Sequence, residues 1–172
     1  RAGLGIADIM ERLRVSRSHV KHRRVPRRDS YFATTFGTPG SAPMHRDAAL
    51  ALLHEYTKNP SLVKHMLAVE AAMRAYARKL GQDEEKWGIV GLLHDFDYER
   101  WPNPPDHPLK GSEILRERGY PDDVIYAIKS HADYLTDCPR RSALDKTLYA
   151  CDELAGFVTA VARLRPEGIV GM

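Results

Sequence analysis

The sequence predicts an all-α fold, a compact bundle of about five to seven helices. Two observations predict it. Apolar residues recur three and four positions apart in several successive segments, which is the period of a helix with one buried face. Proline, glycine and side-chain capping residues separate these segments, as they do at helix ends. With 172 residues, 43% of them hydrophobic, the chain is long enough to bury the core of one domain.

The first two predicted helices are residues 47–58 and 60–80. The first ends at Asn59-Pro60, and Pro60 with Ser61 starts the second. Gly81 closes the second helix. Its predicted inward stripe has steps of four and three and comprises Leu62, Met66, Val69, Met73, Tyr76 and Leu80. His65 lies against this stripe, so its ring is expected to face the core.

The third predicted helix starts after its capping residue Asp83 and runs to His94 and Asp95. Residues 87–93 are almost wholly apolar and leave no polar face, so this helix is expected to be buried. Its end would then deliver an imidazole and a carboxylate into the interior. A buried ionised carboxylate is costly unless it is paired or bound to a metal, and the adjacent histidine favours a metal.

Three predicted elements follow. Residues 101–106 are rich in proline and form a loop that walls one side of a pocket. Residues 107–118 form a helix, so His107 sits at a helix start, where outward N–H groups can hold an anion. In the next helix, which starts at Pro121, His131 shares a face with the apolar residues Val124 and Ile128.

The last predicted helix starts with a capping box of Ser142 and Asp145 and runs to Pro166. Its apolar stripe comprises Leu144, Leu148, Cys151, Ala155, Val158 and Ala162. Asp152 points to the core in this register, whereas Glu153 points away. An inward aspartate with no cation on its own stripe has no ready structural explanation.

Each of these polar residues has an ordinary structural interpretation when it is taken alone. An adjacent His-Asp pair can be a helix end, His65 a core histidine bonded to a backbone carbonyl, and His131 a helix-ending histidine stabilised by the helix dipole. Their joint occurrence on separate buried faces favours a common site.

The order of these residues resembles the HD-domain superfamily of metal-dependent phosphohydrolases, whose pattern is a histidine, a later His-Asp dipeptide and a distant aspartate. The resemblance covers about residues 48–166 and includes Lys64-His65-Met66, Leu92-Leu93-His94-Asp95 and the run from Tyr149 to Ala155. It implies an HD-domain bundle with a metal site between core helices.

The resemblance also implies the ligands. His65, His94, Asp95 and Asp152 would hold a first ion, and Asp95 would bridge to a second ion held by His107 and His131. The alternative is a single ion, with the last two histidines contacting phosphate instead. The expected cofactor is a divalent transition metal, Mn, Fe, Co, Ni or Zn, as one or two ions; Mg is a further candidate.

The implied activity is hydrolysis of a phosphomonoester or phosphodiester by metal-activated water, with Asp95 as the catalytic residue and a nucleotide as the expected small substrate. Four cations flank the site and are candidates for holding phosphate, although each is also explained as a solvated surface charge: Lys110, Arg140, Arg141 and Lys146. In the cyclic-di-nucleotide branch of the family a glycine and a lysine follow the dipeptide. Asp97 and Tyr98 stand in those places, so that specificity is not carried over.

Two other functions stay open. Some HD-fold members use the six-ligand site to activate oxygen, which would make the protein a di-iron oxygenase. The other alternative is a non-catalytic, regulatory HD module whose basic N-terminal arm contacts nucleic acid. Nucleic acid is otherwise not an expected partner.

The basic excess lies at the start of the chain. Residues 1–43 contain nine basic and three acidic residues, a charge of +6, which leaves 17 basic and 20 acidic residues, or −3, for residues 44–172. We therefore predict an extension and linker over 1–43, part of it disordered, and an HD domain over 44–172. The extension has four interpretations: a poor helix-turn-helix match, a basic arm, a targeting segment, or residues before a start at Met44.

The cellular compartment is predicted from what the sequence lacks. No apolar run of about 18 residues and no secretory signal pattern is present. The two cysteines, Cys138 and Cys151, are too few for a disulfide scaffold. We expect a cytoplasmic protein that does not associate with a membrane.

Overall fold

A computed structural model describes residues 44–170, and within this range the chain forms six helices and no strands. The helices are α2 (Arg46–Tyr56), α3 (Pro60–Leu80), α4 (Glu84–Leu93), α5 (Asp106–Glu117), α6 (Asp122–Ser130) and α7 (Ala143–Leu164). The all-α prediction is confirmed. The predicted extension, residues 1–43, lies outside the described residues.

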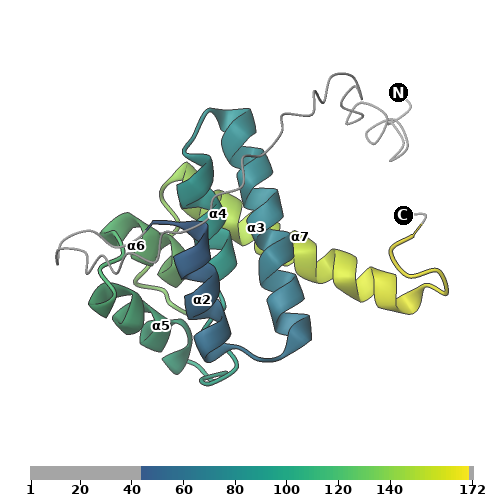
Figure 1. Ribbon diagram of the computed structural model, residues 1–172, viewed down its shortest axis with the longest axis horizontal. Helices are drawn as coiled ribbons and strands as arrows, with labels where there is room; N and C mark the ends of the chain where they lie inside the picture. The colour runs from purple at the N-terminus through teal and green to yellow at the C-terminus, as the bar shows by residue number, and fades with distance from the viewer. Residues whose placement is uncertain (1–43, 171–172) are drawn as a thin grey trace, which may run out of the picture. The chain divides into compact units, whose positions relative to one another are not determined.

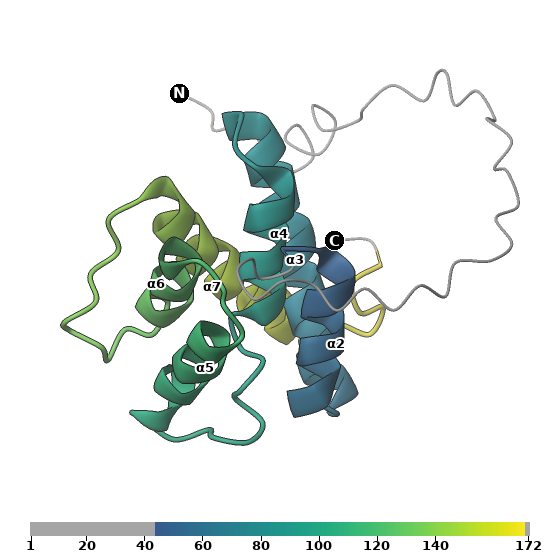
Figure 2. The same cartoon turned by 60° about the vertical axis from the view of Figure 1, so that its left-hand side comes forward.

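Helix α4 is the centre of the bundle. It packs against α2, α3, α6 and α7, most extensively against α3 (Figures 1 and 2). All seven of its residues from Trp87 to Leu93 are buried, as the lack of a polar face predicts. Helices α5 and α6 pack against each other beside it. The end of α4 therefore lies where the other helices meet.

The helix boundaries follow from the predicted capping residues. The Asp83 side chain accepts a hydrogen bond of 3.0 Å from the Lys86 backbone N–H at the start of α4. Gly81 ends α3 with a φ of 65°, a conformation that favours glycine. At α7, Ser142 and Asp145 each accept a hydrogen bond from the other's backbone N–H. These caps stabilise the helices that carry the polar cluster described below.

A buried ion network joins α2, α3 and α4. Glu70 of α3 is 3% exposed and accepts hydrogen bonds from Arg46 at 2.6 and 2.9 Å and from Arg74 at 2.9 Å. Arg74 also donates to Glu85 of α4 at 2.8 Å. Two guanidinium groups thus compensate the charge of one buried carboxylate, which would otherwise be strongly destabilising.

The predicted stripe of α3 is confirmed in its first half and wrong at its end. Met66, Val69 and Met73 are fully buried, but Tyr76 is 42% and Leu80 is 48% exposed, and Ala77 takes the inward position. A stripe that repeats every seven residues drifts around a straight helix of 3.6 residues per turn. Over the last turns this drift turns Tyr76 and Leu80 sideways.

The core covers only the first half of α7. Leu144, Leu148 and Cys151 are buried, whereas Phe157 is 67% and Leu164 is 86% exposed. The C-terminal half extends away from the bundle (Figure 1). None of the helices within residues 44–170 combines the length and apolar character that a membrane crossing requires.

The close approach of α3 and α4 depends on Gly91. A Cβ atom at Gly91 would lie 3.0 Å from both the Val69 carbonyl oxygen and the Glu70 nitrogen, which are backbone atoms that cannot rotate away. We expect Gly91→Val to lower the free energy of unfolding by about 1–3 kcal/mol through overpacking. Urea denaturation measures this change.

Gly156→Val is the matched control, because a Cβ atom at Gly156 in α7 has no atom within 4 Å. This variant should keep or slightly raise the stability, since glycine is a poor helix former. Equal losses in the two variants would show that the α3–α4 contact is not the cause.

Candidate metal centre

The six predicted ligands converge from five helices. They are His65 on α3, His94 and Asp95 at the end of α4, His107 at the start of α5, His131 at the end of α6, and Asp152 on α7. Two groups of three among them present ligand atoms that all lie within 4.8 Å of one another: His65, His94 and Asp95, and Asp95, His107 and His131. The geometry of these residues supports the prediction that they bind metal.

Asp152 lies beside the first group and adds a second carboxylate near the Nε2 atom of His94. This nitrogen lies 3.4 Å from Oδ2 of Asp95 and 3.4 Å from Oδ1 of Asp152. Nε2 of His65 lies 2.9 Å from Oδ1 of Asp152 and 3.9 Å from Oδ2 of Asp95. Two imidazoles and two carboxylates therefore face one point.

The second group is a nearly equilateral triangle. Oδ1 of Asp95 lies 3.2 Å from Nε2 of His107 and 3.2 Å from Nε2 of His131, and the two nitrogens are 3.3 Å apart. Asp95 thus turns one oxygen to each group. This is the arrangement expected of a carboxylate that bridges two ions.

Hydrogen bonds on the far side of each ring determine where three of the imidazoles carry their protons. Nδ1 of His94 lies 2.8 Å from the Gly91 carbonyl oxygen, and Nδ1 of His131 lies 2.5 Å from the Ile128 carbonyl oxygen. A carbonyl oxygen only accepts, so each Nδ1 donates a proton. In the neutral rings the lone pair then lies on Nε2, toward the cluster.

Asp97 orients the third ring. Its Oδ1 lies 2.8 Å from Nδ1 of His107, and its Oδ2 accepts a 2.8 Å hydrogen bond from the Gly111 backbone N–H near the start of α5. Asp97 is only 1% exposed. The sequence alone allows three roles for Asp97, namely orienting a ligand, acting as an acid or base, or being a solvated loop residue, and its burial and two hydrogen bonds support the first. The sequence predicts that backbone N–H groups at this helix start can hold an anion, and the Asp97 carboxylate takes that place.

The donor set fits divalent cations. Nε2 of His94 is buried and has no hydrogen-bond partner within the described part of the chain, and the Nε2 atoms of His107 and His131 lie 3.3 Å apart. When both rings are neutral, the lone pairs on these two nitrogens face each other, and a cation between them relieves the repulsion. Two ligands about 2.1 Å from one ion at a tetrahedral angle are about 3.4 Å apart, close to the triangle edges observed.

Comparison with known proteins decides the family. The family model described as "HD domain" matches residues 62–156, which include all six predicted ligands. The chain belongs to the HD-domain family. HD domains bind divalent metals, and the two His/Asp groups of this one could hold them. The predicted fold and family are therefore confirmed, and the assignment of individual ligands stays a prediction.

The HD domain is also similar to curated proteins named Ribonuclease Y. It is 33% identical over 100 residues to that of Nitratidesulfovibrio vulgaris (strain DP4), and 31% identical over 102 residues to those of Oleidesulfovibrio alaskensis and Desulfotalea psychrophila. Each match covers 56% of this chain and 18% of the relative. The chain thus matches less than a fifth of their length. No solved structure matches significantly.

The cluster of the HD domain is electrostatically coupled when no metal compensates its charges. Burial disfavours charge on His94, but the carboxylates of Asp95 and Asp152 raise its pKa well above the ordinary value. Burial opposes ionisation of Asp95 as well, yet His94 and hydrogen bonds from His107 hold its pKa well below the usual range. Despite burial, Asp95 and Asp97 raise the pKa of His107 to about 9.

These shifts predict opposite pH responses with and without metal. A raised histidine pKa stabilises the fold below the unfolded pKa near 6.5, and this contribution is lost as pH rises to about 9. The melting temperature of chelator-treated protein should therefore fall by about 5 °C over this interval. Metal-loaded protein should not lose stability there, since metal binding requires deprotonated nitrogens. Parallel curves from scanning calorimetry would contradict this prediction.

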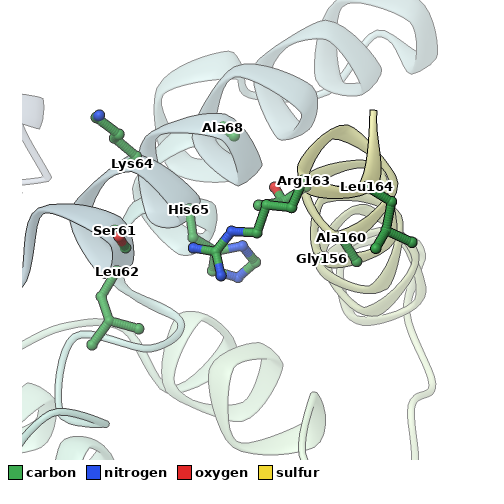
Figure 3. A pocket seen from close by; sticks show the side chains of 10 residues that line it. Ser61, Leu62, Lys64, His65, Ala68, Gly156, Ala160, Arg163 and Leu164 are labelled. Carbon is green, nitrogen blue, oxygen red and sulfur yellow. The ribbon is translucent and has the colours of Figure 1, made fainter. Parts of the chain in front are cut away.

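The cluster is accessible from one side. The side chains of His65, Asp95 and Asp152 retain exposures of 20%, 18% and 20%, whereas the three other imidazoles are at most 7% exposed. His65 also lines a pocket of about 790 Å³ between α3 and α7 (Figure 3). The His65 side is therefore where a small molecule could reach the cluster.

The predicted phosphate-binding cations lie outside this pocket, and their role stays a prediction. Lys110 pairs with Glu113 at 3.2 Å. Arg140 pairs with Asp133, and its guanidinium lies 3.7 Å from the Tyr149 ring centroid. The other two, Arg141 and Lys146, are exposed.

Arg163 of α7 lines the pocket and was not predicted from the sequence. A signal for it existed, because Arg163 follows Asp152 by 11 residues, which is close to three helical turns and places both residues on one face of α7.

Proposed function

We propose that this HD domain is a metal-dependent phosphohydrolase that cleaves a phosphomonoester or phosphodiester, with a nucleotide as the expected substrate type. The observation that carries the proposal is the double contact of Asp95, which faces one donor group with each oxygen. Bound divalent cations would supply Lewis acidity toward phosphoryl oxygens and would acidify a water molecule at neutral pH.

The residues of the chain supply binding and orientation. Asp95 and Asp152 provide negative charge that attracts cations into a largely buried site. The hydrogen bonds at Nδ1 of His94, His107 and His131 keep their lone pairs aimed inward, so that little reorganisation is needed. The open side beside His65 admits the phosphate ester.

Three buried side chains that could act as nucleophiles are poorly suited to that role. Burial raises the pKa of the Cys151 thiol to about 11, so the reactive thiolate is scarce at neutral pH. The hydroxyls of Ser112 and Ser130 donate to the backbone carbonyls of Pro108 and Ala127, each at 2.9 Å. This supports direct attack by water without a covalent enzyme intermediate.

The names of the relatives add one substrate class. Ribonuclease Y is by its name an enzyme acting on RNA, which is a phosphodiester. Because this chain matches only 18% of those proteins, short RNA joins nucleotides as a candidate substrate without replacing them. Location in the cytoplasm stays a prediction from the sequence.

Two measurements test the proposal. Protein purified without chelators is analysed for metal content, and then Mn, Co, Ni and Mg are each tested with nucleoside monophosphates, cyclic nucleotides, short RNA and p-nitrophenyl phosphate. Metal-dependent release of phosphate or of a shorter nucleotide supports the proposal. Metal-loaded protein that cleaves none of these esters would overturn it. Iron with a mixed-valence signal and oxygen-dependent product would favour the oxygenase alternative instead.

A further inference from the structure

The pocket between α3 and α7, here called the α3–α7 groove, shares His65 with the predicted metal centre. Its lining includes Ser61, Leu62, Lys64 and His65 from α3, and Gly156 and Arg163 from α7. His65 belongs to both the groove and the cluster, since its Nε2 lies 2.9 Å from Oδ1 of Asp152. A ligand in the groove therefore touches the exposed edge of the centre.

The charge of the groove is positive. Lys64 and Arg163 line it, and no carboxylate of the described residues does. Figure 3 shows the Arg163 side chain extending from α7 toward His65, while the Lys64 side chain points away. No acidic side chain within residues 44–170 forms an ion pair with Arg163, in contrast to Arg74 and Arg140, which are paired. A cation without such a pair beside an anion-processing site favours an anionic ligand group.

The helix geometry sets the separation between this cation and the reaction centre. Arg163 follows Asp152 by 11 residues, a rise of about 16 Å along α7. Side chains on a helix lean toward its N-terminus, so the Arg163 guanidinium reaches back toward the centre. The backbone positions of Asp152 and Arg163 are thus about three helical turns apart, a span that a nucleoside with an anion at each end can bridge when the arginine reaches back.

The other side chains that line the groove are mostly apolar. Leu62 approaches from α3, and Ala160 and Leu164 approach from α7. A pocket of about 790 Å³ has the size of ordinary sites for small organic ligands. A base and a sugar can pack on these side chains while the anions are held at the two ends.

Resting on the proposed hydrolase function, we propose that the substrate carries a second, separate anionic group held by Arg163. The substrate class is a nucleoside phosphorylated at two positions, such as a nucleoside 3′,5′-bisphosphate. In the reaction, the oxygen of water forms a bond to one phosphorus, the ester P–O bond breaks, and the leaving oxygen takes a proton. The other phosphate stays on Arg163.

Activity on three substrates tests the groove separately from the metal centre. Wild-type protein should cleave adenosine 3′,5′-bisphosphate with a kcat/KM at least about tenfold above that for adenosine 5′-monophosphate. Arg163→Gln should lower kcat/KM for the bisphosphate by about 10- to 100-fold and leave cleavage of p-nitrophenyl phosphate within about twofold. Arg163→Lys should restore part of the loss.

Two further variants complete the design. Gly156→Trp fills the groove from a position where an added Cβ meets no atom within 4 Å, so it should exclude the bisphosphate without unfolding the protein. Arg116→Gln, an exposed arginine of α5, is the matched control and should change neither activity. Equal loss of both activities in Arg163→Gln, or no preference of the wild type for the bisphosphate, would overturn the inference.

Binding separates failure of this inference from failure of the proposed function. Calorimetry of metal-free wild-type protein with adenosine 3′,5′-bisphosphate should show affinity that Arg163→Gln lowers at least about tenfold. Such binding without hydrolysis of any ester would support the role of Arg163 in the groove and contradict the proposed hydrolase function. Hydrolysis of p-nitrophenyl phosphate without Arg163-dependent binding would support the hydrolase function and contradict the role of Arg163.

Discussion

Asp95→Ala is expected to remove the bound metal and to lower phosphate ester hydrolysis by about a thousandfold or more. Asp95 is the only residue shared by the two groups of candidate ligands. Its loss would remove the negative charge that faces His94, His107 and His131. A loss of about 4 kcal/mol of transition-state stabilisation corresponds to the rate effect stated. Elemental analysis of the purified variant and initial rates with p-nitrophenyl phosphate measure the two effects.

Glu153→Ala provides the control for this prediction. Glu153 lies one residue after Asp152 but is exposed, so its carboxylate points away from the cluster. Its metal content and rate should match those of the wild type. His94→Ala should behave as Asp95→Ala does. Equal metal occupancy in all three variants would contradict the ligand assignment, and circular dichroism shows whether each variant remains folded.

Asp97→Ala is expected to weaken the second ion selectively, by about 10- to 100-fold in affinity. Asp97 accepts hydrogen bonds from His107 and from the Gly111 backbone N–H. Its removal therefore leaves the His107 ring without the hydrogen bond that orients it. Titration of metal-free protein should change from two ions per chain to one tightly bound ion. The first group does not use Asp97 and should keep its affinity.

Gly111→Ala tests the same contact from the other side. A Cβ atom at Gly111 would lie 2.7 Å from the Asp97 carboxylate, so the carboxylate must move. This variant should reproduce the loss at the second ion while it keeps every candidate ligand. Glu113→Ala, an exposed change on the same helix, should leave both ions in place. Two ions of unchanged affinity in Gly111→Ala would show that Asp97 does not position His107.

Much of the fold could be predicted from local sequence. Capping residues such as Asp83 and Ser142 act within a few positions of themselves, so helix ends were predictable to within one or two residues. The ion network of Glu70 was missed, because its partners Arg46 and Glu85 come from other helices. Tyr76 was placed inward since a seven-residue pattern does not show how far a straight helix drifts from it.

The candidate site was predictable only through the family pattern. Spacing places His65 and Asp152 on inward faces, but contact between residues 87 positions apart depends on how α3 and α7 cross. Asp97 was ambiguous because burial in an irregular segment leaves no periodic signal. Arg163 lies beyond the part of α7 that the core covers, so no apolar stripe drew attention to it.

The placement of Asp152, Gly156 and Arg163 along one rigid helix has an evolutionary consequence. Side chains one to three turns beyond the aspartate can be exchanged without replacing any candidate ligand. A library randomised only at these lining positions should therefore yield members with altered substrate preference and unchanged metal content. Descendants of one ancestral domain can diversify by this route while their reactive centre is conserved.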